Sequence, residues 1–134
     1  MNDAARDLIE SLELLPHPEG GFYRETFRSD AEVPAHGGTR SAVTSILFLL
    51  PTGHRSRLHR VRSDELWLHQ RGDDVRLTIG EEETTLSASA NLQAAVPGGV
   101  WQAAEALPGP AGFALVGCVV APGFEFEDFE LEDE

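Results

Sequence analysis

Two stretches of the chain carry polar side chains that are suited to acid–base chemistry. His59 and Glu65 lie in the first stretch, and Gln102 follows the turn-forming residues 97–99 in the second. A histidine can abstract a proton near neutral pH because its unperturbed pKa is about 6.5, and a carboxyl group can act as the acid. If the fold brings the two stretches together, His59 is a candidate general base and Glu65 a candidate acid.

Residues 22–28 add two further candidates. Side chains alternate between the two faces of a strand, so Tyr23, Glu25 and Phe27 share one face, which we interpret as the inward one. Tyr23, the only tyrosine of the chain, could donate a proton or form a hydrogen-bonded wall of a pocket. Glu25 would place a carboxylate among these aromatic side chains.

Each candidate also has a purely structural interpretation. His59 could be a hydrogen-bonded histidine of the sheet, and Glu65 could be a carboxylate at a strand end that pairs with Arg62. Glu65 begins an apolar stretch, so its burial would be costly without a partner. Both interpretations stay open. Further side chains that could contact a ligand are Trp67, His69, Trp101 and Arg57, the last of which could receive a phosphate if it turns inward.

The elements that must position these residues are one helix followed by short strands. Apolar residues recur at helical spacing over residues 3–15, Asp3 is suited to cap this helix, and Pro16 prevents its continuation. Residues 31–39 are expected to form an exposed loop. Many short strands separated by Gly- and Pro-containing turns are typical of a barrel or sandwich. We expect strands at residues 22–28, 42–50, 57–60, 65–70, 75–79, 84–87, 92–96 and 113–120 and near 125–131.

The composition indicates a single acidic domain. A chain of 134 residues with 41% apolar residues can bury one ordinary core. The longest apolar run, residues 42–50, is far shorter than the roughly 20 residues of a membrane helix. A net charge of −13 would repel nucleic acid and anionic membranes, so neither is an expected partner. The N-terminus lacks a secretory pattern, and we expect a cytoplasmic protein.

Several other polar residues are given no chemical role. His17, His36 and His54 are expected to be solvated residues of loops, and Cys118 is expected to be a small buried hydrophobe. Acidic residues are dense over residues 125–134, where they would keep the protein soluble or reflect a saline cytoplasm. This segment is expected to bend between Phe126 and Phe129 and to cover the barrel or a partner subunit.

Two of these stretches resemble the paired motifs of the cupin superfamily. The first runs from Gly53 to Gly72 and the second from Pro97 to Gln102. Residues 17–26, 63–67, 96–102 and 117–124 are similar to a family of small single-cupin proteins of undefined function, whose barrel resembles that of sugar-nucleotide epimerases. The resemblance implies one cupin domain over residues 1–134. A short helix and joint would occupy residues 1–20, and an all-β, jelly-roll-like double-stranded β-helix with a C-terminal tail would follow at residues 21–134. It also implies a homodimer in which terminal segments take part.

The resemblance implies where a metal ion would bind, and the chain departs from that pattern. Metal cupins offer two histidines and a glutamate in the first motif and a histidine in the second, whereas Val61 and Gln102 occupy two of these places here. Valine is no ligand, and a carboxamide is a weak ligand for a transition metal. We expect no cofactor and no tightly bound metal. If a divalent metal does bind, the ligands would be His59, Glu65 and Gln102, with possible rescue by His69.

Three functions remain open. The leading hypothesis is a pocket for a small polar metabolite such as a carbohydrate derivative, with His59 as the base of an isomerase or epimerase reaction and Glu65 or Tyr23 assisting. The alternatives are a non-catalytic small-molecule-binding cupin and a metal-dependent oxygenase or isomerase. We predict that one cavity brings together Tyr23, Glu25, His59, Glu65, Trp67 and Gln102.

Overall fold

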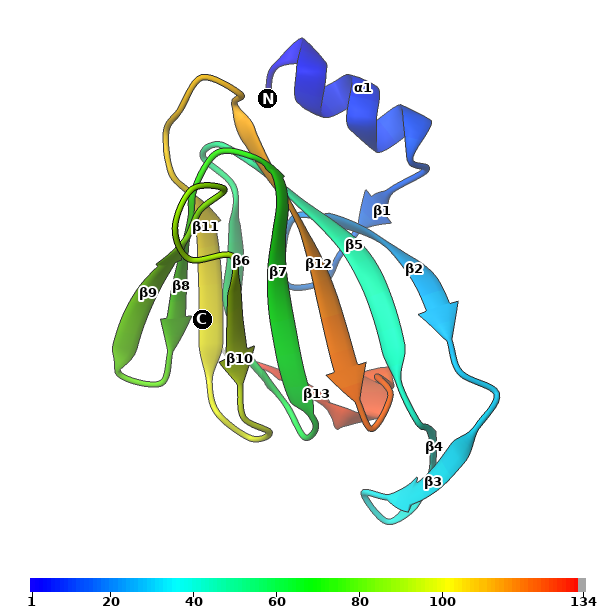
Figure 1. The fold of residues 1–134 in the computed structure, drawn as a ribbon. Coiled ribbons are helices and arrows are strands. Elements are labelled where there is room, and N and C mark those ends of the chain that lie inside the picture. Colours follow the sequence, from blue (N-terminus) through cyan, green and yellow to red (C-terminus); the bar gives the residue numbers. More distant parts are fainter. Residues whose placement is uncertain (133–134) are drawn as a thin grey trace.

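Two antiparallel sheets face each other and form a barrel (Figure 1). The computed structural model describes residues 1–132. In spatial order the larger sheet contains β1 (Leu15–Pro16), β2 (Phe22–Arg28), β5 (Thr44–Pro51), β12 (Phe113–Ala121), β7 (Asp64–Gly72) and β10 (Gln93–Val96). The smaller sheet contains β13 (Phe129–Leu131), β6 (Arg55–Val61), β11 (Gln102–Ala106), β8 (Val75–Ile79) and β9 (Glu82–Leu86). The predicted all-β barrel is confirmed.

The strands at the centre of the larger sheet are buried on both faces. Phe48 of β5 joins the core between the sheets together with Trp67 of β7. The next residue of β5, Leu49, points the other way and packs with Leu115 of β12 in a second cluster beneath the helix. Because both faces are covered, the sequence of β5 is a nearly continuous apolar run and does not alternate with polar residues.

The helix α1 (Asp3–Ser11) lies on the outer face of the larger sheet (Figure 1). It is shorter than the predicted segment 3–15, because Glu13 adopts a positive φ of 55° and Leu14 N–H donates to Ile9 O at 2.9 Å. Its cap is Asn2 and not Asp3, since the Asn2 side chain accepts a hydrogen bond from Ala5 N–H at 2.9 Å. Among the described residues, no helix has the length and apolar character needed to cross a membrane.

A hairpin of β3 (Glu32–Ala35) and β4 (Gly38–Ser41) projects beyond the ends of β2 and β5 (Figure 1). The prediction of an exposed loop over residues 31–39 is therefore wrong. His36 and Gly37 form the two-residue turn, and both have a positive φ, as such tight hairpin turns require. The hairpin was not predicted because the segment contains Pro34, and proline is disfavoured in strands other than edge strands.

After β12 the chain folds back across one end of the barrel. It forms the short 3-10 helix η1 (Phe126–Asp128) and then β13, which pairs with β6. We refer to residues 122–131 as the C-terminal cap. Figure 1 shows its red part crossing the lower end of the barrel. The expected bend between Phe126 and Phe129 is confirmed, and the cap covers the barrel of its own chain.

Candidate functional site

A cavity of about 30 Å³ lies between the two sheets, and Phe124 of the C-terminal cap forms part of its wall. This volume is enough for about one water molecule. The cavity brings together side chains from the loop before β2, from five strands and from the cap. They are His17, Glu19, Tyr23, Thr44, Ile46, His59, Val61, Glu65, Cys118, Val120 and Phe124.

His59 lies on one side of this cavity. Its side chain is 2% exposed, and its Nδ1–H donates to the carbonyl oxygen of Arg57 at 2.7 Å. A carbonyl oxygen can only accept, so the neutral ring carries its proton on Nδ1 and its basic lone pair on Nε2. Burial lowers the pKa of His59 to about 4, although the Arg57 carbonyl acts in the opposite direction. The ring is therefore neutral at pH 7.

Glu65 of β7 provides a carboxyl group in the same cavity. Its Oε1 accepts a hydrogen bond from Gln102 Nε2 at 2.9 Å, and Gln102 Oε1 accepts one from Trp67 Nε1 at 2.9 Å. Burial raises the pKa of Glu65 to about 7, while hydrogen bonds from Gln102 and Cys118 lower it. A substantial fraction of Glu65 is therefore protonated near neutral pH and can donate a proton.

Two lining residues, His17 and Glu19, were not predicted as site residues. Glu19 N–H donates to His17 Nδ1 at 3.1 Å, and Glu19 Oε2 contacts Ser56 Oγ and lies 3.3 Å from His59 Nδ1. Burial raises the pKa of Glu19 well above its usual value. Burial, and then the charge of His59, lower the pKa of His17 to about 4. The expectation of a solvated His17 is therefore wrong.

The loop before β2 turns inward because its glycines permit a close approach. Gly20 and Gly21 have φ values of 110° and 73°, in the region that favours glycine. A Cβ at Gly20 would overlap the carbonyl oxygen of Arg55 in β6. The approach lets Arg57 N–H donate to Glu19 O at 2.6 Å. The signal in the sequence is the glycine pair directly after a histidine and a glutamate.

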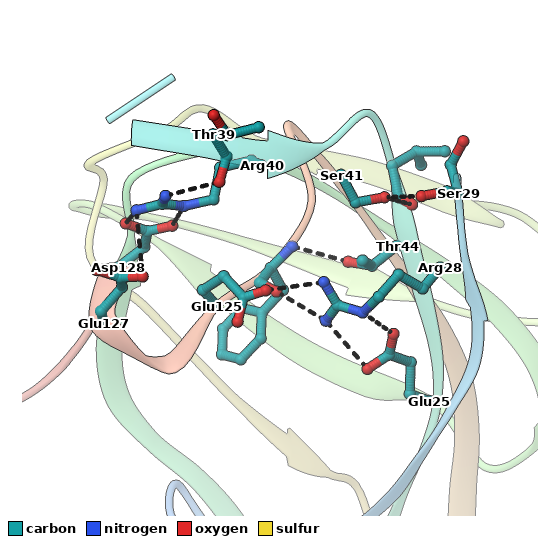
Figure 2. A network of polar contacts seen from close by, with 12 residues as sticks. Glu25, Arg28, Ser29, Thr39, Arg40, Ser41, Thr44, Glu125, Glu127 and Asp128 are labelled. Carbon is teal, nitrogen blue, oxygen red and sulfur yellow. Dashed lines mark hydrogen bonds and ion pairs between the residues drawn. The ribbon is translucent and has the colours of Figure 1, made fainter. Parts of the chain in front are cut away.

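Glu25 shares the inward parity of β2 but lies outside the cavity. Figure 2 shows it paired with Arg28, whose Nε lies 2.7 Å from Glu25 Oε1. β2 is at the open side of the sheet, where its register with β5 shifts between Glu25 and Phe27. The prediction that Glu25 and His59 line one cavity is therefore wrong, because this part of β2 is exposed at the end of the barrel.

The other predicted ligand contacts surround the cavity without lining it. Trp67 and Gln102 are fully buried behind Glu65. His69 shares the buried face of Trp67, but its Nε2 is hydrogen-bonded to the carbonyl oxygen of Asp73 at 2.8 Å. Trp101 lies outside the cavity, where its ring stacks 4.7 Å from the guanidinium carbon of Arg60. The Arg57 side chain does not line the cavity, to which that residue contributes the carbonyl that orients His59.

The fold and the cavity identify the class of protein to which the chain belongs. A barrel of facing antiparallel sheets that encloses a small cavity is the architecture of the cupins. The chain belongs to the family described as Cupin superfamily (DUF985), whose model matches residues 6–132. The predicted superfamily and family are confirmed.

Similar proteins come from distant organisms. An uncharacterised protein of Saccharomyces cerevisiae is 32% identical over an alignment that covers 96% of this chain and 77% of that protein. Among solved structures, a hypothetical protein from Leishmania major is 35% identical with a TM-score of 0.87, covering 96% of this chain and 86% of that one. A protein from Shewanella oneidensis is 39% identical with a TM-score of 0.84, covering 99% of this chain and 86% of that one.

The metal site of cupins does not fit the donors of this chain. Val61 lines the cavity at one ligand position, and Gln102 at another is engaged with Glu65 and Trp67. Within residues 1–132, no three or more His, Cys, Asp or Glu side chains are grouped so that they could hold a metal ion. We therefore derive no chemical step through a metal.

Proposed function

We propose that the cavity binds a small polar metabolite and moves a proton on it, with His59 as the base and Glu65 as the acid. The observation that carries this proposal is the opposite effect of burial on two groups that line the same cavity. The pKa of His59 falls to about 4 and that of Glu65 rises to about 7. A neutral histidine and a protonated carboxyl are the forms that general base and general acid catalysis require.

The proposed reaction is an isomerase or epimerase step on a hydroxy-carbonyl compound. His59 Nε2 removes a proton from the carbon beside the carbonyl, and Glu65 donates its proton to the carbonyl oxygen. The resulting enediol is resolved when His59 returns its proton to carbon and Glu65 recovers a proton from oxygen. Tyr23 also lines the cavity, and its hydroxyl is the proposed second donor.

The lining favours a neutral, hydroxylated ligand. Carboxyl and imidazole groups can both donate to and accept from hydroxyl groups. Among the described residues, the cavity lining includes no arginine that could receive a bare anion. A carbohydrate fragment with a carbonyl group matches these requirements.

A non-catalytic binding module is the second candidate, and the size of the cavity favours it. A volume of about 30 Å³ does not accommodate a metabolite unless part of the wall moves. A protein that encloses its ligand and holds it needs such a movement but needs no proton transfer.

Exchange of carbon-bound hydrogen tests the catalytic proposal. Dihydroxyacetone is incubated with the protein in deuterated water, and proton NMR follows deuterium incorporation beside the carbonyl. We expect incorporation with the wild type and at least about a tenfold loss in His59→Gln and Glu65→Gln, as is typical for removal of a general acid or base. Matched controls are His54→Gln and Glu81→Gln, because both side chains are exposed. Equal exchange in all five proteins would contradict proton transfer, and saturation transfer to the probe without exchange would favour the binding module.

A further inference from the structure

We propose that the C-terminal cap is a gate, which closes the cavity as observed and swings off the barrel to admit a ligand, with the Arg40–Asp128 ion pair as its latch. The gate rests on the proposed function, because it gives access to the same cavity. Its opening can nevertheless be measured without any ligand.

The cap covers the groups that a ligand must reach. Phe124 forms part of the cavity wall. The ring of Phe129 lies 5.5 Å from that of His59, and the rings of Phe126 and Phe129 each lie 5.8 Å from that of His17. Both histidines are thus shielded by aromatic rings of the cap, so a molecule larger than water can reach them from this side only after the rings withdraw.

A buried ion pair holds the cap to the β3–β4 hairpin, which continues from the ends of β2 and β5. Arg40 of β4 donates from Nε and Nη2 to the two carboxylate oxygens of Asp128, at 2.8 Å each (Figure 2). The side chains are only 6% and 1% exposed. Glu127 adds a third oxygen, 3.7 Å from Arg40 Nη2. A two-pronged pair with little exposure has one geometry, so it fixes the cap in the closed position.

Two weaker pairs hold the flanks of the cap. Arg28 of β2 lies 2.8 Å from Glu125, and Arg60 of β6 lies 2.6 Å from Glu130. These side chains are about half exposed, so water and salt weaken both pairs. Three arginines from three strands thus pair with acidic residues of the cap.

The cap is attached less extensively than the walls formed by the central strands of the larger sheet. Its strand β13 is a three-residue edge strand that, within residues 1–132, pairs with β6 alone. The walls formed by β5, β12 and β7 lie in the interior of the larger sheet and are paired on both sides. Local opening in proteins begins where few hydrogen bonds and contacts must break, which selects the cap over the sheet.

The chain contains a natural reporter of this opening. Cys118 is its only cysteine, lines the cavity and is buried on β12. A small uncharged reagent such as iodoacetamide can reach the thiol when the cap opens, whereas access through the sheet requires unfolding. The rate of Cys118 alkylation under native conditions therefore measures how often the gate is open.

The main test is the latch variant Asp128→Asn. Removal of one partner leaves the other charge buried, so we expect alkylation of Cys118 to accelerate about a hundredfold. Glu125→Gln breaks only an exposed pair and should accelerate it about two- to fivefold. This second variant keeps the test usable if Asp128→Asn folds poorly. The matched control is Arg76→Gln, which breaks the exposed pair with Glu105 on the smaller sheet and should label at the wild-type rate.

Two further measurements separate a gate from general loosening. Hydrogen exchange in Asp128→Asn should quicken over residues 122–131 and stay slow over β12. Urea unfolding gives the population of the unfolded chain, from which labelling through global unfolding is calculated. The gate would be contradicted if Asp128→Asn and Glu125→Gln both label Cys118 at the wild-type rate. It would also be contradicted if the labelling rate equals the rate calculated from the population of the unfolded chain. Because no ligand is used, these results are independent of whether the cavity proves to be catalytic.

Discussion

At the scale of single residues, the buried carboxyl of Glu65 couples stability to pH. Burial raises its pKa from 4.5 to about 7, so between these values the folded chain keeps a proton that the unfolded chain has lost. The contribution of Glu65 is therefore fully present below about pH 4.5 and is lost as the pH rises through about 7. Glutamine does not titrate, so Glu65→Gln does not lose this contribution. The free energy of unfolding of the variant minus that of the wild type should therefore rise by about 3 kcal/mol between pH 4.5 and pH 8.

Urea denaturation at several pH values measures this difference. His17 and His59, whose pKa values are lowered to about 4, act in the opposite direction: their contribution is present above about pH 6.5 and is lost as the pH falls through about 4. This contribution is common to both proteins and cancels in the comparison. Glu81→Gln is the matched control, since its carboxyl is exposed. If the difference in the free energy of unfolding between Glu65→Gln and the wild type does not change with pH, the raised pKa of Glu65 is contradicted.

Trp67 supports the site through its indole N–H. Trp67→Phe removes the donor to Gln102 Oε1 and leaves that buried oxygen without this hydrogen bond. We expect a loss of about 1–3 kcal/mol in the free energy of unfolding, measured by urea denaturation. The double variant Trp67→Phe/Gln102→Leu, which removes both polar partners, should lose less than the sum of the two single changes. Strict additivity would mean that the two side chains are not coupled.

The sequence predicted the part of the site that depends on strand parity. His59, Glu65 and Tyr23 line the cavity, because alternation along a strand fixes the face of each side chain. His17 and Glu19 were missed, since a loop has no such period. Glu25 has the predicted parity but lies beyond the end of the cavity, because parity gives the face of a strand and not the depth along it.

At the scale of elements, the loop before β2 depends on Gly20. Gly20→Ala would combine an unfavourable positive φ with overlap between the new Cβ and the Arg55 carbonyl. Gly53→Ala is the matched control, because Gly53 also has a positive φ but a Cβ there would meet nothing within 4 Å. We expect Gly20→Ala to lower the free energy of unfolding by about 2 kcal/mol more than Gly53→Ala does. Equal losses in urea denaturation would show that the close approach contributes little.

Strands with apolar or alternating patterns were predicted closely, whereas others were missed. The segments 22–28 and 75–79 have the same bounds as β2 and β8. β11 was missed because Gln102–Ala106 is rich in alanine, which has low strand propensity. It is a strand because it pairs with β6 on one side and β8 on the other, and a single sequence does not reveal that pairing.

At the scale of the whole molecule, we propose that the free edge of β2, and not only the terminal segments, forms the interface of the expected homodimer. Within residues 1–132, β1 pairs only with Phe22 and Tyr23, so the outer edge of the rest of β2 has no strand partner. Such an edge can pair with the same edge of a second copy around a two-fold axis. Phe27, which is 54% exposed, lies on this part of the strand.

Light scattering after size exclusion checks the dimer. We expect a mass near twice the 14.6 kDa of the chain at micromolar concentration. Phe27→Glu should shift the protein toward the monomer, because it places a charge on the proposed interface. Leu92→Glu is the control, since Leu92 is similarly exposed at 51% but does not belong to β2. A wild type that is entirely monomeric would contradict the dimer.

The place of the cap in the sequence has a consequence for how the protein is made. His17 is synthesised early and Phe129 only after every strand of the larger sheet, yet their rings meet over the cavity. During synthesis the strands can pair while the cavity is still open to water. The histidine and carboxyl side chains of the cavity are shielded from solvent only when the cap docks.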